Sequence, residues 1–228
     1  MTSTHSPDHS QDPRADIDTI LTRFKRRGCT LLVTGSVDET IAGIATRRLL
    51  GAPECSRKRL LVFSDATFDY VDYCLPGGTN LHESHNWVMM PGYSDQRTDA
   101  PSCPNDINEC DLAHVHREIT HAISHFEQAT GGLAPAELRI GIASLADFLQ
   151  VNDLDAITRF LHQLDDLVRE VNGMGHVRFP IPDSSELVET LSPLFDARIE
   201  LRQQGMEPPE QRWHIPQHEI TTAWTILE

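Results

Sequence analysis

Short apolar runs that alternate with amphipathic helical segments are the feature that most constrains the fold of this chain. The clearest run is Cys29–Thr34, which ends at Gly35 and precedes a helical pattern from Val37 to Leu50. A strand without polar alternation is typical of a parallel sheet buried on both faces. The alternation continues and predicts an α/β fold, a mainly parallel sheet with helices on both faces. We expect further strands at 59–65, 86–90, 138–143 and 176–180, and further helices at 16–27, 68–74, 107–128, 153–172 and 184–191.

The pattern changes after Phe195. Residues 197–202, 211–215 and 221–226 alternate apolar and polar side chains with a period of two, and turn-forming glycines and prolines separate them. This alternation is typical of antiparallel strands with one buried face. The sequence therefore predicts an antiparallel C-terminal meander at one edge of the sheet.

The tryptophans of this meander allow two interpretations. Trp213, Ile215, Trp224 and Ile226 occupy alternating positions, so we expect them to form one core face of a hairpin. The alternative is an aromatic and basic binding surface made by Arg212, Trp213, His214 and Trp224.

The length of 228 residues fits one α/β domain with a substantial core. Residues 1–14 lack periodicity, so we expect a disordered acidic tail, followed by a single domain at 15–228. No run approaches the length of a membrane span, and the first twenty residues lack the basic and apolar regions of a signal peptide. We expect a cytoplasmic protein without a membrane span.

The charge balance is strongly acidic: 34 acidic residues stand against 19 basic ones, and the net charge is −15. Only Lys25 and Lys58 are lysines. Abundant carboxylates hold water in concentrated salt, where ions screen their repulsion, so the composition favours a halophilic host. The alternative is an acidic face that mimics nucleic acid or recruits basic partners. Such a charge also opposes phosphate-backbone binding, so we expect no nucleic-acid partner.

The cysteines form no closely spaced framework, and we expect no structural disulfide. Cys103, Cys110 and His114 lie close together in sequence and are suitable zinc ligands, but they lack the two-residue chelating spacing of common zinc ribbons and fingers. Three further histidines follow: His116, His121 and His125. We expect solvated helix histidines and loop thiols rather than a metal site, and zinc binding is the alternative.

The segment Gly35–Ala42 has the place and the length of a phosphate-binding loop. In such a loop a glycine and four further residues precede Gly-Lys-Ser/Thr, whose lysine contacts the β- and γ-phosphates and whose hydroxyl binds magnesium. Counting from Gly35, the last three positions hold Thr40, Ile41 and Ala42. Asp38 and Glu39 moreover place two carboxylates where the phosphates would lie.

With the strands placed, the chain resembles a RecA/KaiC-like P-loop domain over roughly residues 17–227, and most closely a haloarchaeal branch with degenerate ATPase motifs. The strand, turn and helix around Gly35 are the first similarity. Residues 142–149 resemble the Walker B segment, hydrophobic-Asp-Ser-Leu-Thr-x-Leu-Leu, with Ala143 where the magnesium-associated aspartate belongs. Residues 194–202 resemble the Ala-Asp-Gly-Val-Ile-x-Leu strand that begins the late hairpin. A doubly wound α/β protein unrelated to ATPases is the alternative.

The resemblance implies a RecA/KaiC-like protein, and the substitutions predict one that hydrolyses no ATP and holds no cofactor. We expect a regulatory or scaffolding protein that associates with a protein partner or with copies of itself. Its degenerate phosphate-loop position comprises Gly35, Ser36 and Thr40. The alternative is a nucleotide-binding sensor or residual ATPase that uses backbone amides and cations such as Arg47 or Arg48.

Other polar residues receive structural interpretations. Asp65 stands where related ATPases carry the acid that polarises the attacking water, but we expect it to cap the following helix. Ser144 follows a strand without an assigned base, so a hydrolase is disfavoured. We expect the arginines that acids flank to form local ion pairs; these are Arg169, Arg178, Arg198 and Arg202.

Overall fold

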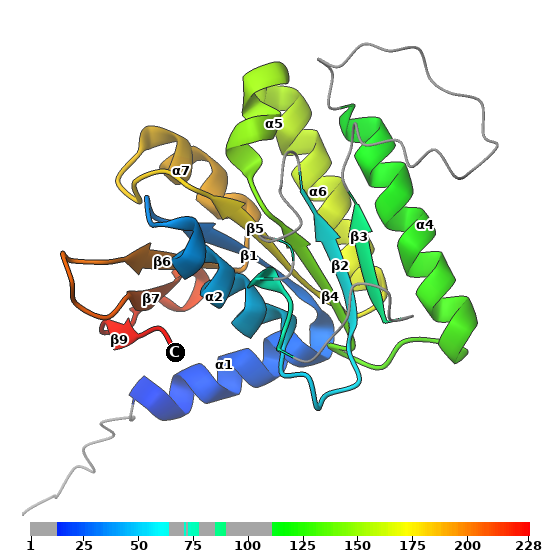
Figure 1. Cartoon of the computed structure of the whole chain (residues 1–228), viewed down its shortest axis with the longest axis horizontal. Coiled ribbons are helices and arrows are strands. Elements are labelled where there is room, and N and C mark those ends of the chain that lie inside the picture. The colour runs from blue at the N-terminus through cyan, green and yellow to red at the C-terminus, as the bar shows by residue number, and fades with distance from the viewer. Residues whose placement is uncertain (1–12, 64–70, 72, 78–84, 90–110) are drawn as a thin grey trace, which may run out of the picture.

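The computed structural model describes residues 13–63, 71, 73–77, 85–89 and 111–228 (Figure 1). The described helices are α1 (Pro13–Arg27), α2 (Glu39–Leu50), α4 (Leu112–Thr130), α5 (Leu145–Val151), α6 (Leu154–Glu170) and α7 (Glu186–Leu191), with short 3-10 helices η1 (Ser192–Leu194) and η2 (Pro216–His218). The strands are β1 (Cys29–Thr34), β2 (Lys58–Val62), β3 (Asn86–Met89), β4 (Leu138–Ile142), β5 (Met174–Phe179), β6 (Ala197–Arg202), β7 (Glu210–Ile215), β8 (Ile220–Thr221) and β9 (Thr225–Ile226).

These strands form one mixed sheet in the order β3-β2-β4-β5-β1-β6-β7-β8, and β9 also pairs with β7. The strands from β3 to β6 are parallel, and β7 runs antiparallel to β6, β8 and β9. The predicted mainly parallel sheet with an antiparallel C-terminal part is therefore confirmed. All residues of β1, β2, β4 and β5 are buried, as expected for strands covered on both faces.

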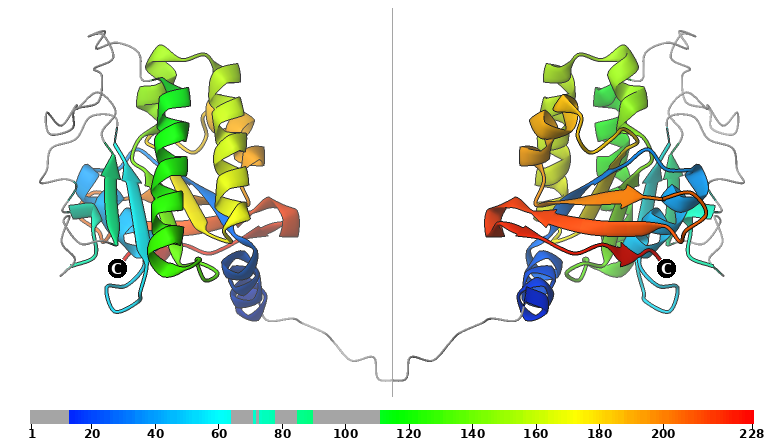
Figure 2. Two further views of the ribbon diagram at one scale, coloured as in Figure 1. Left: turned by 90° about the vertical axis from the view of Figure 1, so that its right-hand side faces the viewer. Right: turned by 90° about the vertical axis from the view of Figure 1, so that its left-hand side faces the viewer.

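Helices cover both faces of the sheet, as the two views in Figure 2 show. On one face, Phe126 of α4, Phe148 of α5 and Phe160 of α6 pack with Leu32 and Ile140 of the sheet in a single apolar core. On the other face, α1 and α2 enclose a second core against β1 and β6. The residues of this core include Ile20, Phe24, Ile41, Leu31 and Ile199.

Local capping explains where several helices begin. Asp153 ends the turn before α6, and its carboxylate accepts a hydrogen bond from the Ala156 N–H at 2.7 Å. Asp111 caps α4 in the same way through the Ala113 N–H. These carboxylates satisfy N–H groups that have no partner inside the helix.

Several boundaries differ from the sequence-based expectation. Helix α1 begins at Pro13, so it takes the last two residues of the expected tail, and α2 begins at Glu39 rather than at residue 37. The expected strand at 221–226 is divided into β8 and β9, because the chain leaves the ladder between them. Asp65, most of the expected helix at 68–74 and nearly all of the expected tail lie outside the described residues. No helix in the described part of the chain is long and apolar enough to cross a membrane.

Candidate functional site

The carboxyl ends of the parallel neighbours β1, β5 and β6 lie side by side at the same end of the sheet. Strand β1 comes first in sequence but lies between β5 and β6, so the chain leaves β1 and β5 in opposite directions across the sheet. In open α/β sheets, ligands bind in the crevice outside such a switch point. A depression of about 390 Å³ lies here. Its lining residues are Gly35, Ser36, Pro182, Asp183, Ser184, Glu200, Leu201, Arg202, Gln203 and Arg212.

Gly35 ends β1 in a conformation that other residues rarely adopt. Its φ angle is +116°, and a Cβ atom at this position would lie 2.2 Å from the Leu201 carbonyl oxygen. Its N–H donates a hydrogen bond to the Ile181 carbonyl at 2.9 Å. The glycine therefore lets the loop pack closely against β6, and its N–H joins this loop to the one after β5 rather than to a ligand. Ser36, the next residue, is exposed.

The N-terminus of α2 is capped by the chain itself. The Asp38 carboxylate accepts a hydrogen bond from the Thr40 N–H at 2.7 Å. Hydrogen bonds with the side chain and the backbone of Thr40 hold the pKa of Asp38 below its usual value. The carboxylate thus occupies the partly positive end of the helix, where P-loop proteins bind a phosphate.

Glu39 forms a second contact between this helix and the sheet. Its two carboxylate oxygens accept hydrogen bonds from Nη1 and Nη2 of Arg178 on β5, at 2.6 and 2.8 Å. The Arg178 side chain is only 6% exposed, whereas that of Glu39 is 61% exposed. A buried guanidinium next to β1 is therefore bound in a bidentate manner by a carboxylate of the same chain.

The positions that would carry the lysine and the magnesium ligand of a P-loop belong to the core. Ile41 is 6% exposed and Ala42 is 1% exposed. Ala143, where the resemblance places a magnesium-associated acid, directly follows β4 and packs against a small apolar cluster around Phe63. None of these three side chains can bind a cation or a phosphate.

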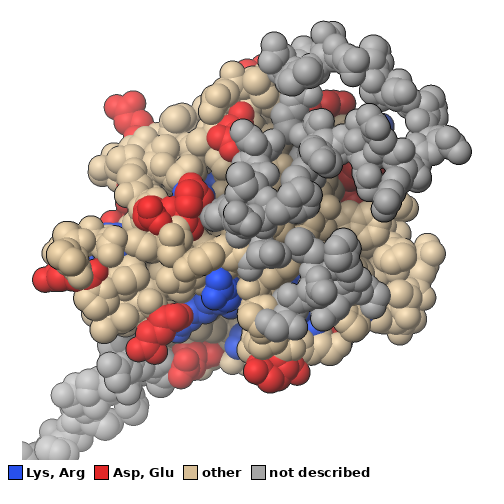
Figure 3. All heavy atoms as spheres, viewed as in Figure 1, with Lys and Arg blue, Asp and Glu red and all other residues tan. Residues whose placement is uncertain are grey.

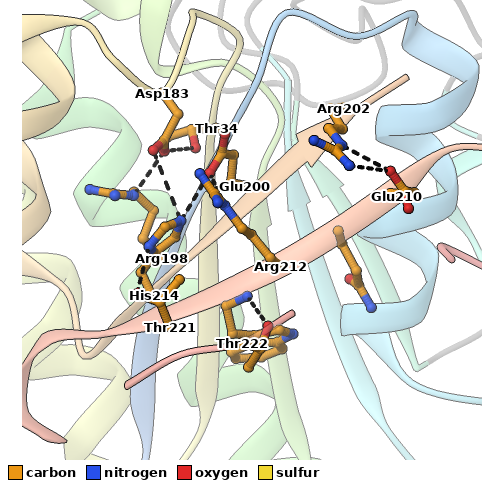
Figure 4. A network of polar contacts seen from close by, with 12 residues as sticks. Thr34, Asp183, Arg198, Glu200, Arg202, Glu210, Arg212, His214, Thr221 and Thr222 are labelled. Carbon is orange, nitrogen blue, oxygen red and sulfur yellow. Dashed lines mark hydrogen bonds and ion pairs between the residues drawn. The ribbon is translucent and has the colours of Figure 1, made fainter. Parts of the chain in front are cut away.

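A network of charged side chains lies beside the loops that follow β1 and β5 (Figure 4). Thr34 Oγ1 donates a hydrogen bond to the Asp183 carboxylate at 2.6 Å, and Arg198 Nε lies 2.8 Å from the same oxygen. Arg198 also donates from Nη1 to Ser192 Oγ at 2.9 Å. Asp183 therefore joins the loop after β5 to both β1 and β6.

Glu200 is the second acidic centre of this network. Arg212 Nε donates to Glu200 Oε2 at 2.6 Å, and His214 Nε2 lies 2.9 Å from the same oxygen. Burial raises the pKa of Glu200, but the hydrogen bonds from Arg212 and His214 outweigh burial, so the pKa lies below its ordinary value. Thr221 Oγ1 lies 3.3 Å from the other ring nitrogen of His214. The network thus extends across β6, β7 and β8.

Asp183, Glu200 and His214 have the chemistry of a metal site. One ligand atom from each lies within 4.8 Å of the other two, and no other such group exists among the residues that the structure describes. Two guanidinium groups, from Arg198 and Arg212, already neutralise the two carboxylates. A divalent cation would have to displace both arginines, so the arrangement favours an ion-pair network over a metal centre.

Trp224 contacts two arginines and does not belong to the core. The guanidinium carbons of Arg202 and Arg212 lie 3.8 and 4.5 Å from the centroid of its ring. Ile226 is 53% exposed, whereas Trp213 and Ile215 pack in the core. The expectation that all four residues share one core face is therefore wrong for Trp224 and Ile226. Because the chain leaves the ladder after β8, the alternation is interrupted before Trp224.

All four arginines of the group form ion pairs, as expected, but only the pairs of Arg169 with Asp165 and of Arg202 with Glu210 are local in sequence. Arg169 contacts Asp165 and Asp196, Arg178 contacts Glu39, Arg198 contacts Asp183, and Arg202 contacts Glu210. Sequence analysis did not single out Asp183 or Glu200. The available signal for Asp183 was its place in the loop that follows β5.

The cysteine and histidine cluster is only partly described. Cys103 and Cys110 lie outside the described residues, and His114 is exposed beside Arg117. Cys29, Cys55 and Cys74 are free thiols. Burial is the main cause that raises the pKa of the Cys29 thiol, to about 12, so this thiol stays protonated at neutral pH.

The fold and the site define an α/β protein with a polar cluster at the switch point of a mainly parallel sheet. Residues 28–201 match the family described as "Family of unknown function (DUF7504)", and the chain belongs to this family. The matched range extends from the residue before β1 into β6, so it contains both loops, Asp183 and Glu200, but not β7. No curated protein matches the chain.

Proposed function

We propose that this chain is a RecA/KaiC-like protein without ATPase activity, which acts as a regulatory or scaffolding protein through association with a protein partner or with copies of itself. The observation that carries the proposal is the contact between Asp38 and the Thr40 N–H. A helix N-terminus that would bind a phosphate already has a carboxylate of its own chain.

The arrangement of the sheet supports the RecA/KaiC-like part of the proposal. The two segments that resemble Walker motifs follow β1 and β4, which are parallel strands with only β5 between them. The carboxyl ends of β1 and β4 therefore lie at the same end of the sheet. Two motifs that bind one nucleotide must lie close together in this way.

Electrostatics supports the absence of ATP turnover. Phosphoryl transfer depends on cations and metal ions that stabilise the charge of the γ-phosphate. Ile41 and Ala42 supply no such group, and the exposed Asp38 and Glu39 repel a polyphosphate. Arg178, the buried cation beside this loop, is already bound to Glu39.

The alternative, a nucleotide sensor or residual ATPase, receives little support from Arg47 and Arg48. Both lie in the last turn of α2, about 12 Å along the helix axis from its N-terminus. Arg47 also donates a hydrogen bond to the Tyr73 carbonyl at 3.0 Å and lies over the Tyr73 ring. Neither arginine is placed to contact a phosphate at the turn after Gly35.

Calorimetry with ATP and magnesium in multimolar potassium chloride tests the loss of nucleotide binding. We expect no binding to the wild-type chain, and micromolar affinity would overturn the proposal. A double variant with Asp38→Ser and Glu39→Gln retains a helix cap but removes two negative charges. Weak phosphate binding by this variant alone would identify the two carboxylates as the groups that exclude phosphate.

Sedimentation of the full chain tests the association. The scattered acidic side chains in Figure 3 support a halophilic setting, so the measurement belongs in concentrated salt. We expect a concentration-dependent oligomer, or a defined hetero-complex after affinity capture from the native cytoplasm and reconstitution from purified components. A chain that remains monomeric and reconstitutes with no captured protein would contradict the scaffolding role.

A further inference from the structure

Two histidines of α4 lie together with a tryptophan of the neighbouring strand β3. The ring centroids of His121 and His125 lie 5.7 and 5.5 Å from that of Trp87 on β3. Phe126 packs against the same indole at 6.4 Å and connects the cluster to the core. The cluster shares no residue with the switch-point site and is independent of the proposed function.

The spacing of the two histidines is suited to chelation. His121 and His125 are one helical turn apart, and side chains at this spacing have Cβ atoms roughly 5–6 Å apart on the same face. Their contact with a single indole places both rings on the same side of α4. Zinc binds imidazole nitrogen at about 2.0–2.1 Å, so two such ligands of one ion lie roughly 3–4 Å apart. Two side chains one turn apart can reach this separation by rotation about their χ angles.

We propose that His121 and His125 form a two-imidazole binding site for a borderline divalent transition ion of the Cu²⁺, Ni²⁺ and Zn²⁺ class. Imidazole is the preferred ligand of these ions, whereas Mg²⁺ and Ca²⁺ require oxygen ligands. The Irving–Williams order predicts the tightest binding for Cu²⁺.

Exposure and local charge favour this pair over the group of Asp183, Glu200 and His214. His121 and His125 are both exposed, so an ion retains water at its other positions. No ion pair of either residue is found among the described residues, so no arginine has to be displaced. Among the described residues, no third His, Cys, Asp or Glu is placed to complete a set of three ligands with them.

The test is a metal titration of the full chain without an affinity tag, followed by calorimetry and by tryptophan fluorescence. We expect one equivalent of Cu²⁺ to bind, Ni²⁺ and Zn²⁺ to bind more weakly, and Mg²⁺ not to bind. His121→Gln and His125→Gln should each weaken Cu²⁺ binding by about tenfold or more. Trp87→Phe should retain binding but lose most of the fluorescence quenching, because a bound Cu²⁺ would lie beside this indole.

Two matched controls separate the proposed site from other ligands. His116 belongs to the same helix but does not pack on Trp87, so His116→Gln is the first control. His214→Gln is the second control, because it removes the histidine of the group with Asp183 and Glu200. Both should leave the affinity within twofold of the wild-type value. Unchanged Cu²⁺ affinity in His121→Gln and His125→Gln, an equal loss in His214→Gln, or no saturable binding to the wild-type chain would each overturn the proposal. The histidines would then be packing partners of Trp87 only.

Discussion

Arg178 on β5 and Glu39 at the first residue of α2 form a bidentate pair, with the two hydrogen bonds at 2.6 and 2.8 Å. The arginine comes from the strand next to β1, and the glutamate from the helix that follows β1. The pair therefore fixes the start of α2 against the sheet beside Gly35. The Glu39 carboxylate thus holds the turn after Gly35 in place against the sheet.

Glu39→Gln should lower the free energy of unfolding by about 1–2 kcal/mol, because it removes a negative charge that the buried Arg178 guanidinium faces. The exposure of the Glu39 side chain keeps the loss this small. Urea denaturation at neutral pH measures the change. Glu170→Gln, at an exposed helix end, is the matched control and should remain within about 0.5 kcal/mol of the wild-type value. Equal effects of the two substitutions would show that the Glu39–Arg178 pair contributes nothing to stability.

Gly35→Ala should destabilise the fold by more than about 3 kcal/mol, because the new Cβ would meet the Leu201 carbonyl. Gly205→Ala is the control. Gly205 also has a positive φ, +57°, but open space surrounds the position of a Cβ atom. It should cost only about 1 kcal/mol of backbone strain. Thermal unfolding of both variants separates the steric clash from the strain, and similar losses would refute the close approach.

His176 should make stability depend on pH. Burial, reinforced by repulsion from Arg139, lowers the pKa of His176 to about 4. The unfolded chain therefore binds the proton more readily than the folded chain, so this residue costs stability as pH falls from about 6.5 towards 4. Between pH 7 and pH 5, protonation of His176 should lower the free energy of unfolding by about 2 kcal/mol. Urea denaturation at both pH values should show a smaller difference for His176→Gln than for wild type, and an unchanged difference would contradict the assignment.

Asp183→Asn should cost about 2 kcal/mol, because the substitution removes the charge that Arg198 faces and weakens the hydrogen bond from Thr34. Asp166→Asn, on the exposed side of α6, serves as the control and should have almost no effect. A double-mutant cycle with Arg198→Gln measures the coupling between the two charges, and a coupling energy near zero would exclude a stabilising ion pair.

Much of the fold could be predicted because burial leaves a periodic signature in the sequence. The uncharged run Cys29–Thr34 and the period-two pattern at 197–202 define strands of the two kinds that the structure contains. The contacts of Trp224 could not be predicted in this way, because they depend on where the chain stops pairing with β7 between β8 and β9. The helix α2 begins two residues later than expected, since the Asp38 side chain competes for the first N–H groups.

The sequence by itself determined which chemical groups the turn after Gly35 could offer: two carboxylates, a serine, a threonine and no lysine. It also determined the buried strands and the helices that pack on them, because hydrophobic periodicity is local. Only the tertiary structure decided the partners of those groups. Asp183 meets Thr34, Glu39 meets Arg178, and Trp87 meets two histidines of α4. These contacts join strands and helices far apart in sequence, and their distances depend on sheet order and strand register, which no local pattern specifies.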